Sequence, residues 1–518
     1  MRPKAYILIP PLFLLILGLG SCRKDFDFNP SPGNLIFSKD TVYLDTVFTN
    51  IGSSTYSLKV FNPDDEDIYI PSIRLENGES SGYRLNVDGE AGRNFENIPL
   101  LAKDSLFIFI EVTFDVSTQE QTNFLYTDAL VFQGTTNTQQ IPLVTLIKDA
   151  IFLYPERDSF GVTETLVLGN DAQGNELRLE GFFLDDQELE FTNEKPYVIY
   201  GYAAVPPNST LNIEAGTRVH FHENSGLLVG NQARVTINGA LSEDPELLEN
   251  EVIFEGDRLE PEFNDVPGQW GTVWLAAGSE NNSIAYLTLK NATLGLFVEG
   301  GTDTDTDVIN LTISNSQILN SSLHNLWSLS SMVEATNCVF GNAGDASVYG
   351  NLGGAYHFKH CTIANYWVNG FRSAPALKLD NFLALDDTTI LVEDLALASF
   401  ANCIIDGNRN REISLLGNPE AGFQISFVNC SIKYDTDGVD TGTTPLLDFN
   451  GNPSFVNPFL NRNIGFVQPT SGDFRLDDTS QILGLGDMDT ATSVPLDILG
   501  NNRTERPDLG AYQFLLQE

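Results

Sequence analysis

Six short segments in the second half of the chain share one pattern and recur at a nearly regular spacing. The pattern is apolar-x-Asn-Cys-x-apolar with some substitutions, and its fourth position falls at residues 287, 316, 338, 361, 403 and 430. Spacings in the low twenties match one turn of a parallel β-solenoid, whereas the interval of 42 residues implies an inserted loop or a skipped turn. The repeat therefore predicts an all-β fold whose second half is a stack of coils.

The Asn and Cys positions predict how each coil bends. Simple strand alternation would place the first apolar residue and the Cys, three positions apart, on opposite faces. Both face inward only if the chain turns between them, and Asn tolerates the left-handed conformation that such a turn needs. We therefore expect a structural column of Asn corners and inward Cys residues, formed by Asn337, Cys338, Cys361, Asn402, Cys403, Asn429 and Cys430.

These cysteines are expected to be reduced, buried and apolar in character. Neighbouring side chains in register point in parallel, and the 42-residue interval is expected to separate Cys361 from Cys403. Disulfides between adjacent coils remain the alternative, because strands about 4.8 Å apart bring Cα atoms just within disulfide range.

The beginning of the chain has the features of a secretory signal. Arg2 and Lys4 precede an apolar run that is too short to span a bilayer, and the run ends in Leu-Gly-Ser before Cys22. This ending resembles the bacterial lipobox, which implies removal of residues 1–21 and lipidation of Cys22. Residues 23–27 resemble the tag of lipoproteins sent to the outer face of the outer membrane. We therefore expect a lipid-anchored outer-membrane protein that faces the cell exterior, with the periplasmic face as the alternative.

The rest of the chain divides by pattern. Residues 22–34 contain two Pro and one Gly, which predicts a tether. Residues 35–155 show short alternating strands between turn clusters, which predicts an Ig-like β-sandwich, and because no Cys lies in this range a Cys-Trp-Cys core is excluded. Residues 156–189 are expected to connect the sandwich to a β-helix with a C-terminal cap at residues 190–518.

Several stretches resemble bacterial surface lipoproteins of the right-handed parallel β-helix (pectate-lyase-like) family with an N-terminal Ig-like sandwich. Residues 211–221, 267–271 and 281–292 look like the opening turns of such proteins. Residues 473–476, 497–503 and 507–512 are similar to their terminal cap, and residues 35–48 to the sandwich before the helix. The resemblance implies a right-handed parallel β-helix but no particular activity, because this fold hosts many functions.

The charge of the chain limits its partners. It has 28 Lys and Arg residues against 70 Asp and Glu residues, a formal net charge of −42. Most of such a surface would repel a phosphate backbone, which excludes nucleic acid as a partner class. Cations, neutral glycans and other proteins remain.

The strand after each repeat predicts an outward ladder. Counting ten residues on from positions 316, 338 and 361 gives only apolar residues, which should face the core. Counting eleven gives Trp327, Tyr349 and Arg372, which should then face outward, and Tyr366 and Trp367 would extend the ladder. Aromatic faces suit sugar rings and Arg suits a uronate carboxylate. The alternatives are that loops cover these side chains or that the register differs by one residue.

Catalytic and metal sites are less well indicated. A lyase would need a base and a cation, for which Lys359, His360 and Lys378 are the candidates near the ladder. Asp303, Asp305 and Asp307 alternate as in a calcium loop, although the sequence favours a solvated acidic turn, because the Gly and Glu that an EF-hand loop needs are missing. Calcium is the one candidate cofactor.

Together these features predict a surface-exposed β-helix lipoprotein that acts as a binding or structural module for extracellular glycan. One alternative is a polysaccharide lyase or glycoside hydrolase that acts in the groove of the β-helix. The other is an adhesin or complex subunit that binds a protein partner.

Overall fold

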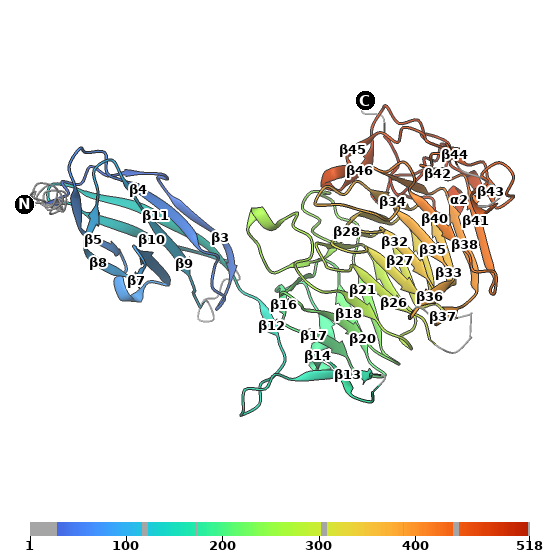
Figure 1. Ribbon diagram of the computed structural model, residues 1–518, viewed down its shortest axis with the longest axis horizontal. Helices are drawn as coiled ribbons and strands as arrows, with labels where there is room; N and C mark the ends of the chain where they lie inside the picture. The colour runs from blue at the N-terminus through green and yellow to red at the C-terminus, as the bar shows by residue number, and fades with distance from the viewer. Residues whose placement is uncertain are drawn as a thin grey trace, which may run out of the picture. The chain divides into compact units, whose positions relative to one another are not determined.

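The chain forms two compact units that consist almost entirely of β-strands (Figure 1). The computed structural model describes residues 28–115, 123–171, 173–301, 308–386, 388–438 and 445–515. The signal segment and Cys22 lie outside the described residues, as do Asp303, Asp305 and Asp307. Within the described ranges, the helices are all too short or too polar to cross a bilayer. The units are residues Met1–Asp149 and Ala150–Glu518.

Two sheets form the first unit, and their inward side chains make one core, as the alternation of the sequence predicts. One sheet contains β1 (Asn29–Pro30), β3 (Val42–Phe48), β5 (Ile68–Leu75), β8 (Asn94–Leu100), β10 (Asn123–Gln133) and β11 (Thr138–Lys148). The other contains β2 (Ile36–Phe37), β4 (Tyr56–Phe61), β6 (Tyr83–Val87), β7 (Glu90–Gly92) and β9 (Ser105–Val112). β1 pairs with β5, so residues 29–30 of the expected tether belong to a sheet.

Three long sheets, parallel apart from one strand pair, form the second unit, and the chain visits them in turn. The first sheet contains β12 (Ile151–Leu153), β16 (Tyr197–Ile199), β19 (Arg218–Phe221), β22 (Val252–Gly256), β25 (Leu287–Lys290), β28 (Gln317–Ser321), β31 (Val339–Ala343), β34 (Thr362–Asn365), β39 (Ile404–Gly407), β42 (Ser431–Ile432) and β44 (Phe459–Leu460). The second sheet contains β13 (Thr165–Asn170), β14 (Glu176–Phe183), β17 (Tyr202–Val205), β20 (Gly226–Val229), β23 (Val273–Leu275), β26 (Leu296–Glu299), β29 (Leu326–Leu329), β32 (Val348–Asn351), β35 (Leu377–Asp380) and β40 (Ile413–Leu416). The third sheet contains β15 (Glu190–Phe191), β18 (Thr210–Glu214), β21 (Arg234–Asn238), β24 (Asn282–Ala285), β27 (Leu311–Ser314), β30 (Met332–Thr336), β33 (Gly354–Lys359), β38 (Leu395–Ala401), β41 (Phe423–Val428) and β43 (Phe455–Val456).

Smaller elements complete the chain. They are the hairpins β36 (Phe382–Ala384) with β37 (Ile390–Val392) and β45 (Phe466–Gln468) with β46 (Asp473–Leu476), the helix α2 (Met488–Ser493), and the 3₁₀ turns η1 (Gly78–Ser80), η2 (Asp186–Glu188), η3 (Pro261–Phe263), η4 (Pro445–Leu447) and η5 (Pro469–Ser471).

The second unit begins earlier than the sequence pattern indicates. Residues 156–189, expected to be a connection, contain β13 and β14, and β12 pairs with β16 of the first sheet. β13 and β14 are antiparallel, and most side chains of β14 are exposed, so this segment shows neither the repeat nor a clear alternation. The second unit therefore starts at Ala150, directly before β12, which is its first paired strand.

The Asn column lies where the third sheet ends and the first sheet begins. Asn337, Asn402 and Asn429 have φ values of 53°, 55° and 50°, and His360 has the same conformation at 51°. This left-handed region is the one that Asn tolerates best among residues with a side chain. Each following Cys is fully buried. The repeat thus marks a corner followed by an inward side chain.

The four cysteines at residues 338, 361, 403 and 430 are free thiols, and each directly precedes one of four neighbouring strands of the first sheet. The expectation that the 42-residue interval separates Cys361 from Cys403 is wrong, because Thr362 pairs with Ile404 in the first sheet. The additional residues leave the coil as a loop before β35 and as the hairpin β36–β37. An insertion that loops outward leaves the strand stack unbroken.

Candidate functional site

The outer faces of the three sheets differ in what covers them. The C-terminal segment packs on the first sheet, where Phe474, Ile498 and Tyr512 share a cluster with Val339 and Ala364. The third sheet carries mostly small or polar outward side chains, as in the paired positions of Ser283, Thr312, Glu334, His357 and Ser399. The outer face of the second sheet carries large aromatic side chains instead.

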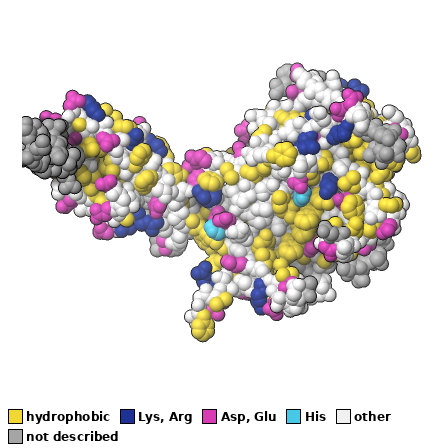
Figure 2. Space-filling view, in the orientation of Figure 1, with side chains coloured by type: hydrophobic (Ala, Val, Ile, Leu, Met, Phe, Trp, Pro, Cys, Tyr) yellow, Lys and Arg dark blue, Asp and Glu magenta, His cyan; other side chains and the backbone are white. Residues whose placement is uncertain are grey.

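The aromatic ladder consists of Trp274, Phe297, Trp327 and Tyr349, each directly paired with the next in register. Their ring centroids lie 5.6, 4.8 and 6.3 Å apart in that order, and the planes of Trp327 and Tyr349 differ by only 4°. All four side chains are half-buried. Figure 2 shows hydrophobic side chains gathered on the visible face of the second unit, over the part where Figure 1 labels β26 and β32.

Lys378 and Asp380 end the ladder. Lys378 pairs in register with Tyr349, and its Nζ lies 3.9 Å from the centroid of that ring and 3.7 Å from Asp380 Oδ2. The Tyr349 hydroxyl donates a hydrogen bond to Asp380 Oδ2 over 2.9 Å. Burial, and secondarily Asp380, raise the pKa of Tyr349, so its hydroxyl remains a donor. These contacts hold the last ring in place.

Polar groups also flank the ladder along its length. Trp274 Nε1 donates to Glu299 Oε2 over 2.7 Å. His324 lies beside Trp327 and Tyr349, with ring centroids 6.0 and 5.4 Å away, and burial lowers the pKa of His324. The ladder is therefore an apolar strip with a carboxylate at each end and a neutral imidazole beside it.

The sequence analysis placed Trp327 and Tyr349 in this ladder but missed Trp274 and Phe297. Phe297 follows repeat position 287 by ten residues rather than eleven, so a fixed count passes over it. Alternation within each strand would have found both, because Val273 and Leu275 are buried on either side of Trp274, and Leu296 and Val298 on either side of Phe297.

The prediction that Arg372 continues the ladder is wrong, since Lys378 pairs with Tyr349 instead. Arg372 lies in the loop before β35, and its side chain is only 3% exposed. Its Nη1 and Nη2 donate to both carboxylate oxygens of Glu412 over 2.8 and 2.6 Å. The loop after β34 is longer than those after β28 and β31, so the count of eleven ends before the strand begins.

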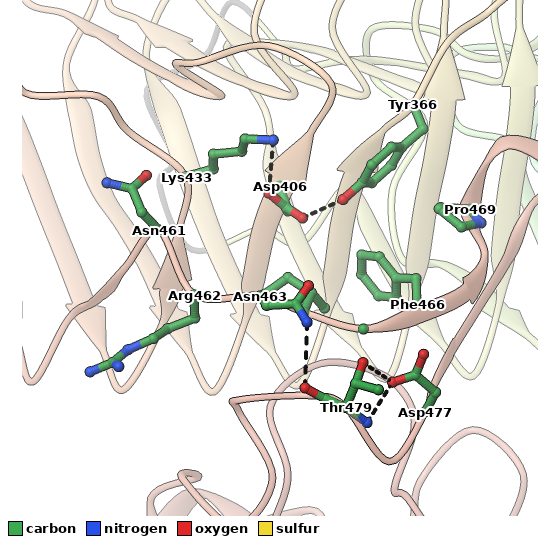
Figure 3. A pocket seen from close by; sticks show the side chains of 12 residues that line it. Tyr366, Asp406, Lys433, Asn461, Arg462, Asn463, Phe466, Pro469, Asp477 and Thr479 are labelled. Atoms are coloured by element: carbon green, nitrogen blue, oxygen red, sulfur yellow. Dashed lines mark hydrogen bonds and ion pairs between the residues drawn. The ribbon is translucent and has the colours of Figure 1, made fainter.

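Tyr366 and Trp367 do not join the ladder either. The Tyr366 hydroxyl donates to Asp406 in a cavity of about 540 Å³ beside the end of the first sheet (Figure 3). Trp367 is buried, and its backbone N–H donates to Asn365 Oδ1. Both residues follow directly after β34, so the coil carries them to a different corner from the ladder.

Of the three catalytic candidates, only Lys378 lies at the ladder. Lys359 ends β33 in the third sheet, with its Nζ 3.5 Å from Ser493 Oγ. His360 is fully buried, next to Arg503 Nη1 and 3.0 Å from Asn402 Nδ2. Burial, and then the charge of Arg503, lower the pKa of His360 to about 2. His360 therefore occupies an Asn corner and packs there as a neutral side chain.

The acid stability of the protein should reveal this buried histidine. Because the pKa of folded His360 lies below 6.5, the unfolded chain binds the proton first, and stability falls as pH drops from 6.5 toward 2. The loss should approach about 1.4 kcal/mol per pH unit. We expect His360→Asn, which suits the left-handed backbone, to remove this slope. Urea unfolding of both forms from pH 7.5 to 5 measures it, and parallel curves for the two would contradict the assignment.

Metal ligands do not gather in the described part of the chain, where no group of three or more His, Cys, Asp or Glu residues could hold an ion. The calcium candidates at residues 303, 305 and 307 are outside that part. The calcium prediction therefore stays a prediction.

Comparisons with known proteins add little. No family model matches the chain, and no curated protein matches it. A family 123 glycoside hydrolase from Clostridium perfringens aligns over 22% of this chain and 26% of its own, with 5% identity and a TM-score of 0.16. The collagen-binding subdomain of the Enterococcus faecalis surface protein ACE aligns over 20% of this chain and 93% of its own, with 13% identity and a TM-score of 0.10. At these TM-scores neither likeness bears on the fold or the function of this chain.

Proposed function

We propose that the second unit is a right-handed parallel β-helix and that its aromatic ladder binds extracellular glycan, in a lipoprotein anchored at the outer membrane through Cys22. The handedness follows from the strong preference of parallel crossover connections for the right hand. The return of the chain to each of three parallel sheets supports the β-helix. The membrane anchor rests on the lipobox-like sequence before Cys22.

The single observation that carries the glycan proposal is the ladder itself. Four half-buried aromatic side chains lie in register on the outer face of the second sheet, one on each of four neighbouring strands, with ring centroids 4.8–6.3 Å apart. Pyranose rings present C–H groups that pack on aromatic faces, and the flanking polar groups accept or donate hydrogen bonds to hydroxyls. A strip of this kind suits an extended saccharide chain better than a compact ligand.

The charges around the ladder favour neutral sugars over uronates. Asp380 and Glu299 place carboxylates at its two ends, and Lys378 is already paired with Asp380. The Arg expected from sequence to bind a uronate carboxylate is buried elsewhere. Like charges therefore oppose an acidic sugar on this face.

Replacing ladder residues should weaken glycan binding without unfolding the protein. Because truncation removes the apolar area that a sugar ring would cover, we expect Trp327→Ala to reduce affinity about tenfold, or about 1.4 kcal/mol, and Trp327→Ala/Tyr349→Ala to abolish binding. Screening the full chain on an array of neutral and acidic glycans identifies the ligand, and calorimetry with the best neutral oligosaccharide measures the loss.

Phe107→Ala provides the matched control, since Phe107 is an exposed aromatic residue of the first unit. Its affinity should equal that of the wild type. Unchanged binding in Trp327→Ala/Tyr349→Ala would exclude the ladder as the site. New ultraviolet absorbance from C=C bonds on incubation with uronate polymers would instead favour the lyase alternative.

A further inference from the structure

Four cations lie together at one corner of the second unit, although the chain as a whole is strongly acidic. Arg409 and Arg411 follow β39, Lys433 follows β42, and Arg462 follows β44. These three strands are consecutive neighbours in the first sheet, so the cations lie in the turns that follow successive strands, and the strands themselves span roughly 10 Å. We call Arg409, Arg411, Lys433 and Arg462 the basic corner.

The arginines of the basic corner have no carboxylate partner among the residues that the structure describes. Arg411 donates through Nε and Nη2 to the backbone carbonyls of Asp435 and Asp437, each over 2.8 Å. Arg409 Nη1 donates to the carbonyl of Arg372 over 2.7 Å, while its Nε is buried and unbonded. Backbone carbonyls hold the guanidinium groups of Arg409 and Arg411 in place but carry no negative charge of their own.

The carboxylates nearest the corner offset this charge only in part. Asp406 Oδ1 lies 3.9 Å from Lys433 Nζ, its other oxygen accepts from the Tyr366 hydroxyl, and burial raises the pKa of Asp406. Asp477 accepts from the backbone and hydroxyl of Thr479 within its own turn. Asp435 accepts from the backbone of Asp437.

Two cavities open beside these cations. Arg409, Asn410, Arg411 and Asp435 line one of about 420 Å³. Lys433, Asn461, Arg462 and Asn463 contribute to the other, of about 540 Å³, and Figure 3 shows Lys433 turned toward Asp406, with Asn461 and Arg462 on the side away from Tyr366. Each cavity is large enough for a sugar carrying one charged group, and amide side chains stand beside the cations as further donors.

We propose that the basic corner binds sulfate or carboxylate groups of an acidic polysaccharide. Nε and Nη2 of Arg411 already bond to backbone carbonyls, so Arg411 offers its Nη1 to such an anion. Arg462 lines the second cavity, and a guanidinium group can pair with planar or tetrahedral anions through two parallel hydrogen bonds. Cations in the turns after three successive strands match charges repeated along a polymer. Because 70 acidic residues repel polyanions elsewhere, the corner is also where such a chain would be retained. This site is separate from the aromatic ladder and does not depend on it.

Binding of dextran sulfate, compared with neutral dextran of equal length, tests the proposal on the full chain. We expect binding of the sulfated polymer only, weakened steeply by salt, and at least a tenfold loss of affinity in Arg411→Gln/Arg462→Gln. Arg475→Gln is the matched control, because Arg475 is exposed but paired with Asp473, and it should change affinity less than twofold. Tryptophan fluorescence melting should give the same midpoint for all three proteins.

Equal binding of neutral and sulfated dextran would overturn the proposal, as would equal losses in the double variant and in Arg475→Gln. A single-stranded oligonucleotide that binds as tightly as dextran sulfate would overturn the assignment to polysaccharide. If inorganic sulfate displaced dextran sulfate when both supplied the same total charge, the corner would bind single anions. That result would overturn its match to a polymer. Loss of ladder binding in Trp327→Ala leaves this test unaffected.

Discussion

Glu412→Ala should destabilise the second unit by about 3–5 kcal/mol, the cost of leaving a buried charge without its partner. The Glu412 side chain is fully buried and accepts both guanidinium bonds of Arg372. It also accepts the backbone N–H groups of Arg409 and Ala376, each over 2.8 Å. Truncation removes all four bonds at once and leaves the Arg372 cation in a site without solvent.

Urea unfolding followed by tryptophan fluorescence measures this loss. All four tryptophans, residues 270, 274, 327 and 367, belong to the second unit, so the signal is free of the first unit. Glu176→Ala breaks an exposed pair with Arg178 in the same unit and should cost at most about 1 kcal/mol. Glu412→Ala/Arg372→Met should recover part of the stability, because no unpaired charge remains. Equal effects of the two single variants would contradict the buried-pair explanation.

Phe400→Ala should cost a similar amount, about 3–5 kcal/mol, because it opens a cavity in a stacked column. Phe340, Phe358, Phe400, Phe427 and Phe455 follow one another inside the second unit with centroids 5.9, 5.1, 4.9 and 5.0 Å apart. Phe400 is fully buried between two neighbours, so neither neighbour can move in to fill the space without leaving its own strand register.

The same fluorescence assay compares Phe400→Ala with Phe371→Ala. Phe371 is 90% exposed in the loop that also holds Arg372, and its truncation should change stability by less than about 0.5 kcal/mol. A loss in Phe400→Ala below 1 kcal/mol would show that the interior relaxes around the missing ring, and would contradict a rigid column.

Local sequence patterns predicted the inward or outward direction of side chains correctly wherever the repeat has no insertion. Alternation in β29 and β32 turns Leu326 and Val348 inward, which leaves Trp327 and Tyr349 outward and adjacent. The same reasoning failed one strand later, where a longer loop moved the outward position from Arg372 to Lys378. Counting residues holds only while each turn has the same length, whereas strand register is set by hydrogen bonding between neighbours.

His360 shows a second limit of sequence reasoning. It was one of three catalytic candidates, next to Lys359 in the sequence, yet the repeat already placed it in the column otherwise occupied by Asn337, Asn402 and Asn429. Its partner Arg503 is 143 residues away along the chain, so no local pattern could reveal the contact.

The sequence by itself determined the all-β class, the recurrence of strands and the corners, because backbone conformation and strand alternation depend on neighbouring residues. Only the tertiary structure decided which outer face the C-terminal segment covers and which arginines find a carboxylate partner within the described ranges. The C-terminal segment covers the first sheet, and Arg372 is buried because it pairs with Glu412. Both outcomes depend on contacts between residues that are distant in the chain, and on burial, which a linear pattern does not contain.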